Sequence, residues 1–402
     1  MGVSHADARA CGPLELLVIQ PTPFCNLDCS YCYLPDRLNK KRMSLEVLER
    51  VFQRVFESDI VDGPFTVVWH AGEPMVLPPA FYRAAFDLAE RANRRRIPVT
   101  HSFQTNGTLL DEEWCDLIKE NDLRVGVSVD GPAFLNDRHR KTRRGAGTHE
   151  RVMAGVAQLQ RNQVPFHVIT VLTDEALDYP DEIYAFYVAH GIDDVGFNIE
   201  EIEGPNERSS LSAAGAEARY RRFMSRFFDL ATFGNLRMRV REFESTLASI
   251  MHDGADDVPR TQENTPLVIL SVNSDGDFSS FSPELLGLSS AAYGDFLLGN
   301  VATVSLRQAV DTAGFRKLAG DISAGVDRCR LTCEYFGFCG GGAPVNKYSE
   351  NGSFDSTETL FCRLNRKVLV DVILDKLEHG VPPKACDGSS GPGARAASPG
   401  SV

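Results

Sequence analysis

Apolar and β-branched runs alternate with stretches of helical period through the first half of the chain, and this alternation constrains the fold more than any other feature. Six runs read as strands: residues 14–20, 65–70, 98–104, 124–129, 164–172 and 194–199. A helix after each strand returns the chain to the same edge of the sheet, so the strands become parallel. We therefore predict an α/β fold whose six βα units form a partial barrel, (β/α)6, open on one side.

The composition is that of a protein with a sizeable hydrophobic core. The chain has 402 residues, of which 43% are hydrophobic and 24% charged, and its net charge is −13. Nucleic-acid binding requires a concentrated basic surface, so this balance argues against a nucleic-acid partner. The N-terminus shows no secretory signal, and no apolar run is long enough to span a bilayer. We therefore predict a cytoplasmic protein without a membrane partner.

The order of the segments predicts five regions. They are an N-terminal tail (1–11), the barrel (12–230), a bridging helical region (231–266), a smaller C-terminal domain (267–383) and a disordered tail (384–402) rich in Gly, Ser, Ala and Pro. The stretch from Leu211 to about Met251 reads as helical throughout. The C-terminal domain is expected to begin with a hairpin formed by residues 267–272 and 277–281.

Three cysteines stand within eight residues directly after the first predicted strand: Cys25, Cys29 and Cys32, with Tyr31 before the last. Three thiolates on a short loop can hold a [4Fe–4S] cluster and leave one iron open to another ligand. A zinc knuckle or three buried thiols are alternatives, but zinc sites favour a paired Cys-x2-Cys with a fourth Cys or His nearby, which this loop lacks. The spacing therefore favours an iron–sulfur cluster.

Polar loops follow three further predicted strands. Gly72 and Glu73 follow the second strand, Asn106 follows the third, and Ser128 lies near the end of the fourth. Chemistry in parallel barrels lies at the carboxyl ends of the strands, so these residues are expected around the cysteine loop. Ser128 also fits a buried strand residue bonded to backbone. The basic stretch 138–144 also fits a solvated loop, or a site for a small anion or an acidic peptide.

A second group of cysteines lies in the C-terminal region: Cys329, Cys333, Cys339 and Cys362. Four thiolates are enough for a fully ligated [4Fe–4S] cluster or for a structural zinc ion. Cys115 reads as a packed helix residue, and Cys11 and Cys386 show no partner pattern. Ten cysteines in a cytoplasmic chain indicate metal or redox chemistry rather than disulfides.

Together these motifs resemble the radical S-adenosylmethionine (radical SAM) enzymes that carry a C-terminal SPASM domain, and the resemblance covers residues 12–380. The segments most similar to the Grr/Osc/Xye-type maturases are residues 18–22, 33–37, 281–285 and 339–347. The resemblance implies a SPASM-like iron–sulfur domain after the barrel and S-adenosylmethionine bound at the cluster of Cys25, Cys29 and Cys32. The implied cofactor-binding residues are Tyr31, Gly72, Glu73, Asn106, Ser128 and Arg140.

The resemblance also bears on the number of clusters. A full SPASM domain holds two auxiliary clusters, but residues 275–281 contain no cysteine and Ala343 stands where another cysteine is expected. We therefore predict one auxiliary [4Fe–4S] cluster, at the four C-terminal cysteines.

The Grr/Osc/Xye-type maturases form cyclophanes in ribosomally made peptides (RiPPs), so the resemblance implies an oxidoreductase that crosslinks a peptide. A 5′-deoxyadenosyl radical would take a hydrogen from a β-carbon, and the carbon radical would add to a nearby aromatic ring. Glu284 or Asp277 is expected to take the final proton, and the auxiliary cluster to accept the electron or to shape the peptide site. The implied partners are a precursor peptide, with leader and core, and an external reductant such as flavodoxin or ferredoxin.

Three other functions fit parts of the pattern. A formylglycine-forming sulfatase-type maturase shares most motifs but normally carries both auxiliary clusters, and another SPASM peptide oxidase or thioether maturase is also possible. A non-catalytic Fe–S or zinc-binding interaction protein would need neither Gly72 nor Arg140. Because no domain precedes the first strand, we expect leader recognition by the barrel, the C-terminal region or a separate protein.

Overall fold

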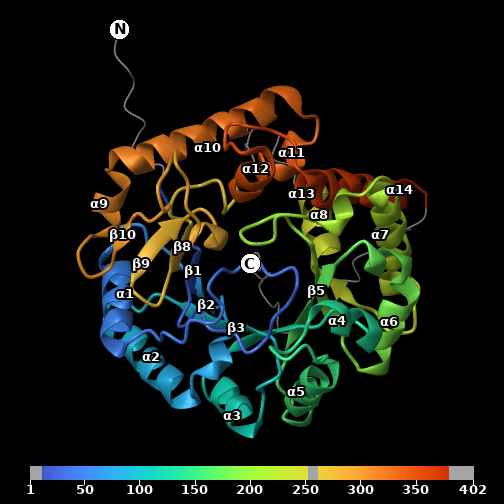
Figure 1. The fold of residues 1–402 in the computed structure, drawn as a ribbon, viewed down its shortest axis with the longest axis horizontal. Coiled ribbons are helices and arrows are strands. Elements are labelled where there is room, and N and C mark those ends of the chain that lie inside the picture. The colour runs from blue at the N-terminus through green and yellow to red at the C-terminus, as the bar shows by residue number, and fades with distance from the viewer. Residues whose placement is uncertain (1–10, 252–260, 380–402) are drawn as a thin grey trace, which may run out of the picture.

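The computed structural model describes residues 11–251 and 261–379, and its centre is one ten-stranded sheet. Six strands are parallel to their neighbours: β1 (Leu16–Ile19), β2 (Phe65–Trp69), β3 (Val99–Thr105), β4 (Arg124–Ser128), β5 (His167–Leu172) and β6 (Asp194–Ile199). These are the six strands predicted from the sequence, with ends that differ by up to three residues. Figure 1 shows the strands curving around a centre with helices outside them.

Four further strands lengthen this sheet at both ends. β7 (Arg239–Val240) pairs with β6, and β8 (Ile269–Val272) pairs in parallel with β1. β9 (Asp277–Ser280) and β10 (Gly299–Asn300) continue from β8 as antiparallel strands. The predicted hairpin therefore exists, and it belongs to the same sheet as the six βα units.

The expectation of one helical stretch from Leu211 to about Met251 is wrong. The stretch contains α7 (Ala216–Phe233), β7 and α8 (Arg241–Met251). The break occurs at Gly234, where a Cβ would lie 2.4 Å from the Leu230 carbonyl oxygen and 2.2 Å from the Tyr184 hydroxyl. That hydroxyl also bonds the backbone of Leu236, so a contact from another helix ends α7.

Helices cover the outer side of the sheet (Figure 1): α1 (Leu45–Glu57), α2 (Pro79–Ala92), α3 (Glu112–Glu120), α5 (His149–Arg161) and α6 (Pro180–Ala189). Ser44 Oγ accepts a bond from Val47 N at 3.2 Å and so caps α1. The buried face of α1 is Leu48, Val51, Phe52, Val55 and Phe56. Each of these side chains contributes roughly 1.5–3 kcal/mol through burial, which holds the helix against the sheet.

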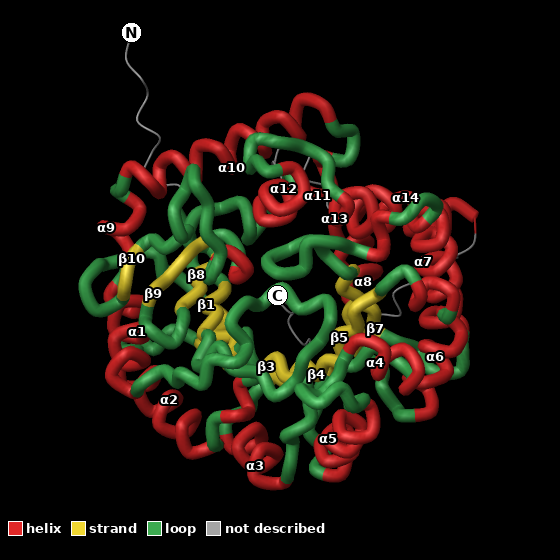
Figure 2. The backbone as a smooth tube through the Cα atoms, in the orientation of Figure 1, coloured by secondary structure: helices red, strands yellow, loops and turns green. Residues whose placement is uncertain are grey.

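Side chains alternate between the two faces of β1 and β2. Leu17, Ile19 and Val67 belong to the main core with the outer helices. Leu16 and Val18 belong to a separate cluster with Val68 and Ile269, on the opposite face. The inner face is therefore apolar at β1, β2 and β8, and Figure 2 shows loops gathered at the centre that the sheet surrounds.

The C-terminal helices run from one end of the sheet toward the other (Figure 1). They are α9 (Leu306–Val310), α10 (Ala313–Thr332), α11 (Phe336–Cys339), α12 (Pro344–Asn351), α13 (Leu360–Cys362) and α14 (Leu369–His379). A separate hydrophobic cluster that includes Phe281, Phe315 and Phe354 holds this region to the end of β9. At the far end α14 packs on α7 and α8. Among the described helices, none has the length and apolar character to cross a membrane.

Candidate radical SAM and auxiliary cysteine sites

Backbone contacts with a distant segment hold the loop of Cys25, Cys29 and Cys32. Asp28 N donates to Lys141 O at 2.7 Å, and Ser30 N donates to His139 O at 3.1 Å. The guanidinium of Arg143 donates to Cys25 O at 3.0 and 3.2 Å and to Arg37 O at 2.8 Å. Part of the basic stretch 138–144 therefore fixes the shape of the cysteine loop. Sequence reasoning did not find this role of Arg143.

Two thiols of the loop, Cys25 and Cys29, have raised pKa values. Burial raises the pKa of Cys25 to about 12 and that of Cys29 to about 11, and Cys32 adds to both shifts. Bound iron would offset this penalty, because a metal cation stabilises the thiolate form. Three grouped, half-buried thiols are therefore suited to a [4Fe–4S] cluster.

The backbone at Gly72 lies directly against the cysteine loop. Gly72 has φ of +74°, and a Cβ there would lie 2.4 Å from Thr22 O and 2.8 Å from Phe24 O. The next amide, Glu73 N, donates to Phe24 O at 2.8 Å. Only glycine fits this close approach. Ala71 also has a positive φ, of 65°, which is a strained conformation for alanine.

The carboxyl of Glu73 is bonded entirely to the protein. Its Oε1 accepts from Thr105 Oγ1 at 2.6 Å and Met75 N at 3.0 Å, and its Oε2 accepts from Asn106 N at 2.8 Å. Glu73 is 1% exposed, and burial raises its pKa to about 7. Glu73 therefore ties the loops after β2 and β3 together.

Asn106 connects the loop after β3 to the cysteine loop. Its Nδ2 donates to Asn26 Oδ1 at 2.8 Å and lies 3.9 Å from Cys25 Sγ. Its Oδ1 accepts from Thr108 N at 3.1 Å. These contacts place Asn106 beside the first cysteine.

Arg140, Asp130 and Tyr31 form a buried group behind the cysteine loop. Two nitrogens of Arg140 each lie 3.0 Å from an oxygen of Asp130, and Tyr31 donates its hydroxyl to the same carboxylate. Arg140 is 7% exposed, so it is not part of a solvated loop. Ser128 Oγ accepts from Gln104 Nε2 at 2.9 Å and is half-buried. The motif Ser128-Val129-Asp130 could have indicated Asp130, which the sequence analysis left out.

Glu284 is half-buried and lies near Glu203, which is buried, and near Glu201 and Glu263, which are half-buried. Its Oε2 accepts from Ser282 Oγ, and Glu284 is among the causes that raise the pKa of Glu201, Glu203 and Glu263. Burial is the main cause, and it raises the pKa of Glu201 to about 8 and that of Glu263 to about 7. We call Glu201, Glu203, Glu263 and Glu284 the glutamate cluster.

Two neutral side chains adjoin the glutamate cluster. Asn346 Nδ2 donates to Glu201 at 2.6 Å and to Glu203 at 3.0 Å. Tyr33 directly follows the cysteine loop, and burial and then the charge of Glu284 raise its pKa well above the usual value. Its hydroxyl lies 3.2 Å from His70 Nε2. The glutamate cluster is therefore bonded to α12 through Asn346 and lies close enough to Tyr33 to raise the pKa of that residue.

Asp277, the other expected proton acceptor, lies elsewhere. It is the first residue of β9, and its carboxylate accepts from Asn300 Nδ2 at 2.8 Å and from Asn273 Nδ2 at 3.3 Å. These bonds stabilise the hairpin. Within the described residues, none of its hydrogen bonds or ion pairs joins it to the glutamate cluster or to the cysteine loop.

The structure brings the four C-terminal cysteines together. They line one cavity of about 320 Å³, shared with Lys347 and Lys367: Cys329, Cys333, Cys339 and Cys362. Cys329 lies near the end of α10, and Cys362 ends α13 and precedes a π-helical turn, Arg363–Val368. Burial raises the pKa of Cys362 to about 12. Three thiols on three helices and a fourth, Cys333, directly after α10 surround one cavity and fit a fully ligated cluster.

The remaining cysteines take no part in these sites. Cys115 is buried on α3, as expected for a packed residue, and Cys11 is half-buried. Cys386 lies outside the described residues. In residues 11–251 and 261–379, no three His, Cys, Asp or Glu side chains converge as ligands of a single metal ion. A [4Fe–4S] cluster binds one cysteine at each iron, so its ligands lie farther apart than those of one ion.

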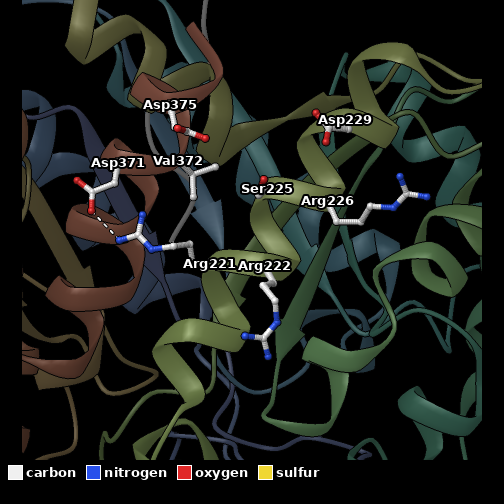
Figure 3. A pocket seen from close by; sticks show the side chains of 8 residues that line it. All are labelled: Arg221, Arg222, Ser225, Arg226, Asp229, Asp371, Val372 and Asp375. Carbon is white, nitrogen blue, oxygen red and sulfur yellow. Dashed lines mark hydrogen bonds and ion pairs between the residues drawn. The ribbon is translucent and has the colours of Figure 1, made fainter. Parts of the chain in front are cut away.

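A larger cavity, of about 630 Å³, lies between α7 and α14 (Figure 3). Arginines and aspartates line it, and Arg221 pairs with Asp371 at 2.6 Å. None of the residues expected from the sequence to bind a cofactor or metal lines this cavity. We therefore place the candidate site at the cysteine loop and not here.

The parallel sheet, the cysteine loop after β1 and the glycine loop after β2 define the radical SAM class. The model of the radical SAM superfamily matches residues 19–187. The matched segment runs from β1 into α6, and the chain has the radical SAM α/β fold. The predicted fold class is confirmed, and the cofactors are those of the superfamily, S-adenosylmethionine and a [4Fe–4S] cluster.

Two relatives show how far the similarity extends. The chain is 46% identical to the uncharacterized protein sll1766 of Synechocystis, over 94% of this chain and 96% of that protein. It is 35% identical to the serine-type anaerobic sulfatase-maturating enzyme of Bacteroides thetaiotaomicron, over 44% of this chain and 43% of that enzyme.

Two solved structures share the fold. One is anSMEcpe with bound AdoMet and Cp18Cys peptide, with a TM-score of 0.73 and 22% identity over 91% of this chain and 98% of that one. The other is Streptococcus suis SuiB bound to precursor peptide SuiA, with a TM-score of 0.61 and 16% identity over 86% of this chain and 75% of that one. The C-terminal region is thus part of the shared fold.

Proposed function

We propose that this protein is a maturase that installs cyclophane crosslinks, bonds between an aromatic ring carbon and a β-carbon, in a ribosomally synthesised precursor peptide. The observation that carries this proposal is the position of Tyr33. It directly follows the cysteine loop, contacts His70, and lies in the field of Glu284 and Glu203. A substrate held here would adjoin both the loop that binds the radical-generating cofactors and carboxyl groups that can take a proton.

The comparisons support a peptide or protein substrate. The Bacteroides relative is named for maturing sulfatases, and the two solved structures hold peptides. The cyclophane reaction in particular rests on the resemblance of residues 281–285 and 339–347 to the Grr/Osc/Xye-type maturases, and on a single set of four C-terminal cysteines.

We assign the radical SAM cluster to Cys25, Cys29 and Cys32, and one auxiliary [4Fe–4S] cluster to Cys329, Cys333, Cys339 and Cys362. When bound and reduced, the first cluster and S-adenosylmethionine supply a 5′-deoxyadenosyl radical that removes a hydrogen atom. Arg143 and Asn106 keep the cysteine loop in shape for this cluster, through the bonds to Cys25 O and Asn26.

Other residues of the site bind or position S-adenosylmethionine. Gly72 lets the backbone of its loop lie beside the cysteine loop, and Glu73 fixes that loop by its three bonds. Arg140 uses part of its fork on Asp130 and retains N–H donors for a carboxylate, while Ser128 offers a hydroxyl. Tyr31 keeps Asp130 in place through its hydroxyl.

The crosslink removes two hydrogens from the peptide. One leaves as an atom from the β-carbon, and the other leaves the aromatic ring as a proton and an electron. We assign the proton to Glu284, because burial raises the pKa of its carboxyl and makes the carboxylate a stronger proton acceptor. The electron would pass to the auxiliary cluster. An external one-electron donor, such as flavodoxin or ferredoxin, would supply the electron that starts the reaction.

Transfer of deuterium tests the proposed hydrogen abstraction. The reconstituted enzyme, S-adenosylmethionine, dithionite and a precursor peptide deuterated at the β-carbon of its aliphatic core residues are combined. We expect deuterium in the 5′-deoxyadenosine product and none with Cys29→Ala. Deoxyadenosine without deuterium would contradict β-carbon abstraction, and a chain that cleaves no S-adenosylmethionine would be a binding protein instead.

A formylglycine-forming maturase is the second candidate, favoured by the name of the Bacteroides relative. Conversion of serine to formylglycine also removes two hydrogens, so the mass change alone does not separate the two reactions. An aldehyde reacts with a hydrazine reagent and a cyclophane does not. Labelling of the product by the hydrazine would therefore favour the second candidate.

A further inference from the structure

A lysine is buried beside the C-terminal cysteines. Lys347, on α12, is 3% exposed. Its Nζ lies 3.3 Å from Cys329 Sγ and 2.9 Å from Gly325 O, and it lines the cavity of the four cysteines. The sequence analysis gave this residue no role, and its place after Cys339-Gly340-Gly341 did not reveal the contact with Cys329.

The charge of Lys347 has no carboxylate partner in the described part of the chain. Lys367, on the same cavity, pairs with Glu358, and the nearby Asp355 pairs with Arg328. Gly325 O offers only a dipole, and as a helical carbonyl it already accepts an amide of α10. Burying an unpaired ammonium is costly. Four thiolates around an iron–sulfur core carry a net negative charge that would compensate it.

We propose that Lys347 raises the reduction potential of the auxiliary cluster, and so makes that cluster the acceptor of the electron released when the aromatic ring is restored. The inference rests on the cluster assignment under the proposed function. Reduction adds one electron to the cluster and makes it more negative. A cation and an N–H donor at a ligand sulfur stabilise that reduced form, because hydrogen bonds to sulfur and local charge set such potentials.

The test measures the potential of the auxiliary cluster alone. In the full chain carrying Cys25→Ala, Cys29→Ala and Cys32→Ala, the group of four C-terminal cysteines is the one assigned cluster site that remains. The one-electron midpoint is followed by EPR during titration with dithionite. Lys347→Met keeps the length of the side chain and removes its charge. We expect reduction to become at least tenfold less favourable, a fall of about 59 mV for one electron.

Three matched variants separate charge, hydrogen bonding and folding. Lys347→Arg keeps the charge and is expected to restore most of the potential, whereas Lys347→Gln keeps a donor without charge and is expected to lie between. Lys317→Met removes a lysine charge from the exposed face of α10, outside the cavity of the cysteines. We expect its midpoint to stay near that of the parent.

The contradicting results are distinct. A parent without iron at the C-terminal cysteines would overturn the cluster assignment and this inference with it. A parent with a full cluster and an unchanged midpoint in Lys347→Met would overturn the inference alone. Loss of iron in Lys347→Met, Lys347→Gln and Lys347→Arg alike would show that Lys347 only supports the fold of the cavity.

Discussion

Replacing Gly72 by alanine perturbs the contact between the glycine loop and the cysteine loop. The new Cβ would lie 2.4 Å from Thr22 O, 2.8 Å from Phe24 O and 3.0 Å from Pro23 C, all of them backbone atoms. The two loops would have to separate by about 1 Å to restore van der Waals distances. The bond from Glu73 N to Phe24 O, now 2.8 Å, would weaken or break.

The cost of Gly72→Ala has three parts. A positive φ costs alanine about 1 kcal/mol. Loss of a buried backbone hydrogen bond costs roughly 1 kcal/mol more. Overpacking against rigid backbone adds about 1–3 kcal/mol. We therefore expect the free energy of unfolding to fall by about 3 kcal/mol or more, with the cysteine loop displaced.

Gly145→Ala is the matched control. Gly145 has φ of +80°, but a Cβ there would meet nothing within 4 Å, so only the conformational cost of about 1 kcal/mol applies. Urea unfolding followed by circular dichroism measures the stability, and iron analysis after anaerobic reconstitution measures the clusters. We expect Gly145→Ala to keep about eight irons per chain and Gly72→Ala about four. Equal stability and equal iron in the two variants would refute the role given to Gly72.

Three further predictions concern other parts of the site. Arg143→Ala removes the bonds to Cys25 O and Arg37 O and should lower the iron content toward about four per chain. The control Arg144→Ala, at an exposed neighbouring residue, should keep its iron. Equal iron in the two variants would contradict the role of Arg143. Glu284→Gln should slow peptide crosslinking by about 100-fold or more while S-adenosylmethionine cleavage continues, and unimpaired crosslinking would exclude Glu284 as the base. The pKa of Glu263 is about 7 in the folded chain and about 4.5 in the unfolded chain. Between these pH values the folded chain therefore binds more protons than the unfolded chain. The stability that Glu263 contributes is present below about pH 4.5 and is lost as the pH rises through 7. Between pH 5 and pH 8, the free energy of unfolding of Glu263→Gln, measured with urea, should therefore rise by about 2 kcal/mol relative to that of the wild type. Parallel pH profiles of the two proteins would contradict the raised pKa.

Local sequence signals predicted the elements that depend on nearby residues. The six parallel strands follow from runs of apolar residues that alternate with stretches of helical period. The arrival of Gly72 and Asn106 at the cysteine loop follows from the rule that parallel strands end at one edge of the sheet. These predictions required no knowledge of contacts between distant segments.

The features that the sequence did not reveal depend on distant pairs. Arg143 bonds the carbonyl of Cys25 across 118 residues, and a basic residue in a basic stretch carries no sign of that partner. Tyr184 ends α7 through Leu236, 52 residues away. The contact of Lys347 with Cys329 arises because the Lys347 side chain reaches from α12 to α10, which sequence spacing does not show. The glutamate cluster likewise combines Glu201, after β6, with Glu263 and Glu284, beside the C-terminal hairpin.

Tandem mass spectrometry of a precursor peptide tests the central claim most directly. A precursor encoded beside the gene is produced together with the wild-type enzyme or with Cys29→Ala, digested, and treated with a hydrazine reagent. The account predicts that the wild type removes two hydrogens per ring, that backbone fragmentation is suppressed between the aromatic residue and its partner, and that no hydrazone forms. An unmodified peptide, or a product that the hydrazine labels, would contradict it.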